Sequence, residues 1–154
     1  MSEKNNIQNR VPIDELEAVL VQFPKAECEV NHRFTPGMYI REIRVPAGTM
    51  VTTMKHKTEH PFVLSQGVAY VTLESGKREI LEAPHTGITK PGTRRAVYAE
   101  SDLVWTTFHV TEETNVEKIC KSILYPHENH LIESQQANQW RESLPNNQPC
   151  LSYQ

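Results

Sequence analysis

The sequence predicts an all-β domain, a sandwich or barrel, with a helix before it and a helical segment after it. Between residues 26 and 110, short runs rich in Val, Ile, Thr, Tyr and Phe alternate with Pro and Gly turn signals. Polar and apolar residues alternate in "MYIREIRV", "VAYVTLE" and "VWTTFHV", as in strands that bury one face. Many short strands at close, regular intervals are typical of a β-sandwich or a β-barrel.

The remaining elements follow from local signals. Residues 1–11 show no hydrophobic periodicity, and we expect a disordered tail there. Residues 12–25 predict a short amphipathic helix that begins near Pro12 and ends at Pro24. Within the strand-rich segment, "ESGKRE" is typical of a hairpin turn. Residues 111–154 predict a helical C-terminal extension and tail, although the β-branched residues of "TNVEKICKSIL" leave a strand open there.

The bulk composition fits one domain and excludes several function classes. The chain has 154 residues and a formal net charge of -3 with scattered Lys and Arg, so we expect no nucleic-acid face. No stretch has the length needed to span a membrane, and the polar start "MSEKNNIQNR" lacks a signal-peptide pattern. The three cysteines are far apart and odd in number, so we expect no disulfide framework and a reduced, cytoplasmic setting.

The stretch "MKHKTEHPFVLSQG" is the most informative for function. With the two-residue period of a strand, His56 and His60 share a face with Phe62 and Leu64, opposite the lysines. Lysine is costly to bury without a partner, so we expect the histidines to point inwards. Inward imidazoles suit a metal or ligand site, and the alternative is a buried histidine hydrogen-bonded to backbone. By its parity Glu59 is a surface carboxylate, which a β-bulge would reverse.

Two segments, "PAGTMVTTMKHKTEHPFVLSQG" and "GITKPGTRRAVYA", resemble the two sequence motifs of the cupin superfamily. Gly48 and Gly67 correspond to the glycines of the first motif, and His56 corresponds to its second histidine. Pro91 and Gly92 correspond to the turn of the second motif. The chain is also similar to small cupin-like proteins predicted in tailed-phage genomes. The resemblance implies a single jelly-roll β-barrel with a small-molecule ligand in its lumen, and a homodimer.

The sequence departs from the cupin metal-ligand pattern. Met54 stands where the first histidine is expected, His60 where the acidic ligand is expected, and Arg95 where the second motif supplies its histidine. Only His56 and His60 bind a typical divalent ion well, because a thioether is a weak ligand and a guanidinium cannot bind a cation. A metal site therefore needs a third ligand from elsewhere in the chain.

His109, at the end of "VWTTFH", is the candidate third ligand. Its strand face also carries Trp105 and Thr107. If that face points inwards, His109 can join His56 and His60 in a three-histidine site for iron, manganese, nickel or zinc, with one position open. If it points outwards, His109 is a surface residue and the core takes the alternate residues, Val104, Thr106 and Phe108. Periodicity favours the outward arrangement, because the Val104 face is the more apolar.

Arg95 indicates a different chemistry, because a guanidinium pairs with carboxylate or phosphate in a bidentate geometry. With Lys90 and Arg94 it places three cations around the turn "KPGTRR", which is either an anion site or a solvated basic turn. The loss of metal ligands together with the gain of an arginine favours an anionic organic ligand held without a metal. The predicted ligand-binding residues are His56, His60, Arg95, Tyr98 and Trp105.

Three function classes follow. The first is a small-molecule-binding protein that holds, and thereby sequesters, an anionic metabolite or nucleotide-like ligand in the barrel lumen. The second is a metal-dependent enzyme, an oxygenase, isomerase or lyase, built on His56, His60 and His109. The third is a structural or interaction module whose Gln-rich tail binds a partner.

Overall fold

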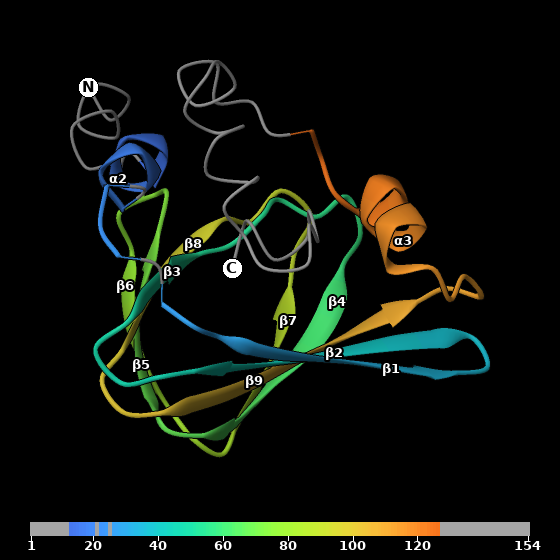
Figure 1. Ribbon diagram of the computed structural model, residues 1–154, viewed down its shortest axis with the longest axis horizontal. Coiled ribbons are helices and arrows are strands. Elements are labelled where there is room, and N and C mark those ends of the chain that lie inside the picture. Colours follow the sequence, from blue (N-terminus) through green and yellow to red (C-terminus); the bar gives the residue numbers. More distant parts are fainter. Residues whose placement is uncertain (1–12, 21, 25, 127–154) are drawn as a thin grey trace, which may run out of the picture.

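The computed structural model describes residues 13–20, 22–24 and 26–126. Its strands form two antiparallel sheets (Figure 1). The all-β prediction is confirmed, since nine strands and two short helices make up the described part of the chain. The tail expected at residues 1–11 and the polar end of the C-terminal extension, residues 127–154, lie outside the described residues. None of the described helices is long and apolar enough to cross a membrane.

The larger sheet has five strands in the order β1-β2-β9-β4-β7, and the smaller has four in the order β3-β8-β5-β6. From β3 onward the chain crosses repeatedly between the sheets, which is the connectivity of a jelly roll. The larger sheet contains β1 (Glu29–Thr35), β2 (Met38–Val45), β9 (Leu103–Val110), β4 (His60–Gln66) and β7 (His85–Thr89). The smaller sheet contains β3 (Met50–Thr52), β8 (Arg95–Ala99), β5 (Val68–Leu73) and β6 (Arg78–Glu82).

Strand β2 shows how the sequence pattern determines the sheet. Tyr39, Arg41, Ile43 and Val45 are buried, and the residues between them are more exposed, as the alternation in "MYIREIRV" predicts. β2 pairs along nearly its whole length with β1 on one side and with β9 on the other. The inner face of this strand therefore contributes three apolar side chains and one arginine to the barrel.

Apolar side chains from both sheets fill most of the space between them. Fully burying one such side chain stabilises the fold by about 1.5–3 kcal/mol. Gly67 closes the connection from β4 to β5 with φ +93°, and a Cβ there would lie 2.2 Å from the Asp102 carbonyl oxygen, so this position requires glycine. The buried cluster comprises Ile43, Val45, Phe62, Leu64, Ala69, Val71, Leu81, Val97, Ala99 and Leu103.

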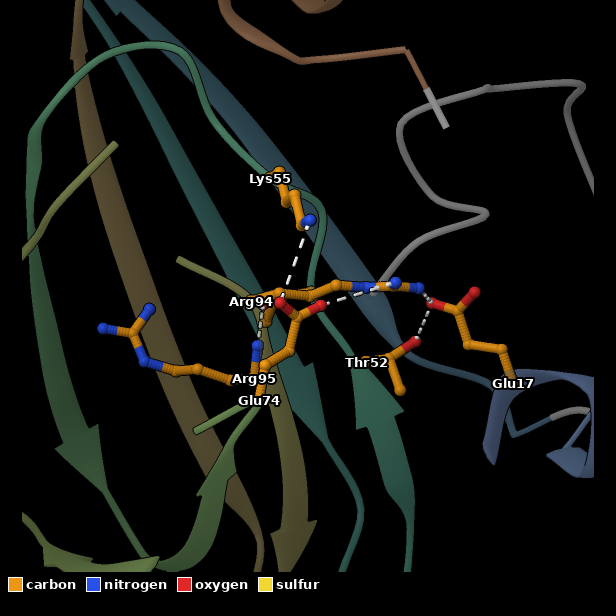
Figure 2. A network of polar contacts seen from close by, with 7 residues as sticks. Glu17, Thr52, Lys55, Glu74, Arg94 and Arg95 are labelled. Atoms are coloured by element: carbon orange, nitrogen blue, oxygen red, sulfur yellow. Dashed lines mark hydrogen bonds and ion pairs between the residues drawn. The ribbon is translucent and has the colours of Figure 1, made fainter. Parts of the chain in front are cut away.

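The N-terminal helix α2 (Ile13–Leu20) docks on the barrel through one apolar and one charged side chain. Ile13 is almost fully buried. Glu17 forms an ion pair with Arg94, just before β8, and accepts a hydrogen bond of 2.7 Å from the hydroxyl of Thr52 (Figure 2). Because both partners of the ion pair are largely buried, it is part of the packing between helix and barrel.

The segment "TNVEKICKSIL", for which the sequence left helix and strand open, forms the C-terminal helix α3 (Val116–Ile123). Its N-cap is Asn115, whose side chain accepts a hydrogen bond from the Lys118 backbone N–H at 3.0 Å. Its buried Ile119 and Ile123 pack against Tyr39 of β2. The helix therefore covers one end of the larger sheet.

Two expectations differ from the structure. The strand expected to begin near Met54 begins at His60, and before it His56 forms only an isolated bridge, with Leu124. The chain bends at residues 57–58, so the histidines reach the lumen from a loop and a strand rather than from one strand. Cys120 is disulfide-bonded, whereas the spacing of the cysteines implied no disulfide framework.

Candidate ligand and metal site

Three histidines from separate elements meet inside the barrel. His56 comes from the loop before β4, His60 from the start of β4, and His109 from the end of β9. The ring centroids are 4.4 Å apart for His56 and His60, 4.6 Å for His60 and His109, and 5.3 Å for His56 and His109. One nitrogen of each ring lies within 4.8 Å of the corresponding nitrogens of the other two. With small side-chain rotations, three imidazole nitrogens at this spacing can reach one ion and leave a further position open.

Backbone carbonyls orient two of the three rings. Nδ1 of His56 lies 3.2 Å from the Met54 carbonyl oxygen, and Nδ1 of His60 lies 3.2 Å from the Thr58 carbonyl oxygen. A carbonyl oxygen only accepts hydrogen bonds, so each Nδ1 carries the proton and each Nε2 keeps its lone pair. On His109, Nε2 lies 2.9 Å from the hydroxyl of Thr107, and Nδ1 has no hydrogen-bond partner among the described residues.

Burial keeps the three imidazoles neutral. Burial is the main reason why the pKa of His56 and the pKa of His109 are each lowered to about 3. The neighbouring histidines lower both pKa values further. Burial also lowers the pKa of His60. A metal ion or a ligand N–H or O–H group needs the lone pair of a neutral imidazole, so these rings are in the protonation state that binding requires.

The outward arrangement expected for His109 is wrong, because its side chain is only 2% exposed and lies against the other two histidines. The cause is the register of β9 with β4, in which Thr107 lies opposite Phe62. Residues directly opposite in an antiparallel pair share a face. Because Phe62 is buried on the inner face, Thr107 and the next inward residue, His109, face the lumen.

The cavity beside the histidines has a cationic polar lining. The volume of this cavity is about 60 Å³. Two guanidiniums line it, one from each sheet, namely Arg41 of β2 and Arg95 of β8. Among the described residues that line the cavity there is no aspartate or glutamate. The site is therefore suited to negative charge.

Arg41 is the functional candidate that the sequence reasoning missed. It is only 7% exposed, and its Nε and Nη2 have no hydrogen-bond partner among the described residues. Burial lowers the pKa of Arg41 to about 10, which still leaves the guanidinium charged at neutral pH. The available signal was its position as the single cation on the otherwise apolar face of "MYIREIRV".

Arg95 enters the cavity as the sequence predicted. Its Nη1 donates a hydrogen bond of 3.1 Å to the hydroxyl of Thr89, and its guanidinium lies 5.3 Å from the centre of the Phe62 ring. Burial lowers the pKa of Arg95. The preceding Arg94 points the opposite way, toward helix α2 (Figure 2). The turn "KPGTRR" is therefore not one basic patch.

The other predicted residues divide between the two sides of the barrel wall. Trp105 lines the cavity and stacks on Phe62, with ring centroids 4.5 Å apart and 9° between the planes. Tyr98 is not among the lining residues and instead stacks on Tyr70 of the neighbouring strand. Glu59 forms a surface ion pair with Lys90, as its parity predicted.

The C-terminal end of α3 holds the loop that carries His56. Lys57 N donates to the Ile123 carbonyl at 2.6 Å, and Tyr125 N donates to the Lys55 carbonyl at 2.9 Å. The carbonyl of His56 itself accepts a 2.9 Å hydrogen bond from Gly92 N. The backbone of this histidine is therefore fixed on two sides, although it lies outside the regular strands.

Comparisons with known proteins identify the fold. No protein-family model matches the sequence, and no curated protein matches it. Ectoine synthase from P. lautus has a TM-score of 0.52 at 13% sequence identity, covering 68% of this chain and 79% of its own. A cupin superfamily protein from Desulfitobacterium hafniense DCB-2 has a TM-score of 0.49 at 11% identity, covering 65% and 88%. Salicylate 1,2-dioxygenase from Pseudoaminobacter salicylatoxidans has a TM-score of 0.49 at 15% identity, covering 62% and 30%.

The two sheets, their jelly-roll connectivity and the likeness to ectoine synthase define a cupin-type fold. The resemblance seen in the two sequence motifs is confirmed at this level. At such low identity the likeness covers the fold alone, and one fold carries many functions. The function therefore has to be argued from the side chains of this cavity.

Proposed function

We propose that the protein binds a small organic anion in the barrel cavity. The observation that carries the proposal is that Arg41 and Arg95 line one cavity whose described lining residues include no acid. An unpaired buried guanidinium is costly, because it has lost water without gaining a counter-charge. An acidic ligand supplies that counter-charge through bidentate, charge-assisted hydrogen bonds.

The remaining cavity residues have complementary roles in this proposal. The arginines bind the acidic part of the ligand, and the neutral imidazoles of His56 and His60 accept hydrogen bonds from its hydroxyl groups or from bound water. The ring of Trp105 packs on its carbon skeleton, as in other small-molecule sites where apolar walls surround a few polar groups. Tyr98 has no role here, because it lies on the other side of the sheet.

A metal-dependent function is the second candidate, and the convergence of His56, His60 and His109 favours it. The residues fit a divalent ion such as iron, manganese, nickel or zinc, since all three imidazoles are neutral and two are oriented by backbone carbonyls. A bound ion would act as a Lewis acid on an oxygen atom of the anion. Because the three imidazoles are neutral, they supply no negative charge to balance a metal cation. An anion bound to the arginines would supply that charge and so favour binding of the cation.

Thermal unfolding with a panel of carboxylates and sugar phosphates tests the first candidate. A ligand that binds only the folded state raises Tm in proportion to RT ln(1 + [L]/Kd). We expect at least one organic anion to stabilise the protein, and Arg95→Met to remove that shift. The matched control is Lys90→Met, which deletes an exposed cation outside the cavity and should leave the shift intact. If no organic anion raises Tm, the proposal is wrong.

Elemental analysis of the purified protein tests the second candidate. We expect near-stoichiometric metal that is lost in His109→Ala and kept in His85→Ala, because His85 lies outside the three-histidine cluster. Metal that remains bound in His109→Ala would contradict a three-histidine site.

A further inference from the structure

We infer that the ligand is a short dicarboxylate, with one carboxylate on Arg41 and the other on Arg95. This inference rests on the proposed binding of an organic anion and goes further by naming the number and placement of its acid groups.

The two guanidiniums approach the cavity from different walls. Arg41 extends from β2 of the larger sheet, whereas Arg95 extends from β8 of the smaller sheet. One carboxylate satisfies the fork of one guanidinium, so arginines on two different walls call for two acid groups.

The donors of Arg41 point to a ligand rather than to a protein partner. Its Nε and Nη2 are buried and unpaired among the described residues, and these are two donors of the fork that binds a carboxylate side-on. A buried unsatisfied group of this kind calls for an explanation, and a missing ion is one of the few available. Arg95 is partly satisfied by Thr89 and keeps further N–H groups for a second carboxylate.

The size and walls of the cavity limit the carbon skeleton. Its volume of about 60 Å³ lies well below the roughly 300–1,000 Å³ of sites for drug-sized ligands, which favours a small acid over a nucleotide. The lining also includes the apolar side chains of Ile43, Val97 and Trp105, which suit a short methylene spacer.

Isothermal titration of the purified full-length protein provides the test. Malonate is compared with propionate, and succinate with butyrate, since each pair differs by the replacement of a methyl group with a carboxylate. We expect the better dicarboxylate to bind about tenfold or more tightly than its monocarboxylate, because a charge-assisted pair is gained. In both Arg41→Met and Arg95→Met this advantage should disappear, whereas Lys90→Met should keep it.

Other outcomes would overturn the inference and separate it from the broader proposal. If mono- and dicarboxylates bind equally well, the inference that the ligand carries two acid groups is wrong, while the proposed binding of an organic anion still stands. Inorganic phosphate that binds as tightly as the dicarboxylates, with the same loss in both arginine variants, would show one compact anion shared by the two guanidiniums. If none of these anions binds, the dicarboxylate inference and the proposed function both fail.

Discussion

The ring of Tyr39 stacks on the ring of His109, with centroids 5.7 Å apart and 28° between their planes. The hydroxyl of Tyr39 lies 2.5 Å from Nδ1 of His32, and burial raises the pKa of Tyr39 to about 12. Ile119 and Ile123 of helix α3 pack against the same tyrosine. Helix α3 thus supports His109 through Tyr39, in addition to holding the loop of His56 by backbone hydrogen bonds.

Truncation of Ile119 should therefore weaken the site from a distance. Ile119 is fully buried, so Ile119→Ala should destabilise the protein by about 2–5 kcal/mol. If the fold persists, we also expect weaker metal retention, because the supports of His56 and His109 loosen together. Lys118→Ala, on the exposed side of the same helix, is the control for both measurements. If a folded but destabilised Ile119→Ala protein keeps its full metal content, α3 does not support the histidine site.

Arg41→Met should stabilise the unliganded protein while it removes anion binding. Replacing a buried, unpaired charge with an apolar side chain of similar length removes its desolvation penalty, which is worth about 1–4 kcal/mol in comparable replacements. Chemical denaturation in the absence and presence of the best carboxylate measures both effects. A loss of stability in the unliganded protein would mean that Arg41 has a structural partner instead.

The ion pair between Glu17 and Arg94 should be the main electrostatic support of helix α2 (Figure 2). Glu17→Ala removes one carboxylate from the largely buried Arg94, whose other acidic partner, Glu74, is 3.8 Å away, so we expect a loss of up to about 3–5 kcal/mol. The double variant Glu17→Leu with Arg94→Leu should recover most of that stability, because neither charge then remains. Urea denaturation checks the comparison, and a double variant as unstable as Glu17→Ala would contradict this account.

The metal-free protein should lose stability in mild acid. His56 and His109 have pKa values of about 3 in the folded protein, whereas in the unfolded chain they protonate near pH 6.5. Below pH 6.5 the unfolded chain therefore binds more protons, and the free energy of unfolding falls by up to about 1.4 kcal/mol per histidine and pH unit. Denaturation between pH 7 and pH 5 measures this slope, which His109→Gln should reduce. A flat profile would show that the histidines are not neutral in the folded protein.

The sequence was sufficient to predict the barrel and the inward direction of two histidines. Strand alternation predicted the buried face of β2, and the cost of burying lysine correctly directed His56 and His60 into the lumen. The position of Arg95 in the second motif placed it correctly as well. The predictions for β2 and Arg95 succeeded because each depends on side-chain chemistry within one strand or one motif. His56 faces the lumen as expected, but from a loop outside the strand on which its parity was counted.

The orientation of His109 and the importance of Arg41 could not be predicted in the same way. Both faces of β9 carry apolar residues, so periodicity defined two faces without showing which one is inside. Only the register with β4 decides the question, and register depends on pairing between distant segments. Arg41 lies on the otherwise apolar face of β2, but its lack of a hydrogen-bond partner for Nε and Nη2 among the described residues is a property of the assembled barrel.

A crystal structure of the protein grown with malonate tests the central claim most directly. The account predicts the ligand inside the barrel, with carboxylate oxygens about 2.7–2.9 Å from guanidinium nitrogens of Arg41 and of Arg95. An empty lumen at a malonate concentration that saturates binding in solution, or a ligand that touches neither arginine, would contradict it.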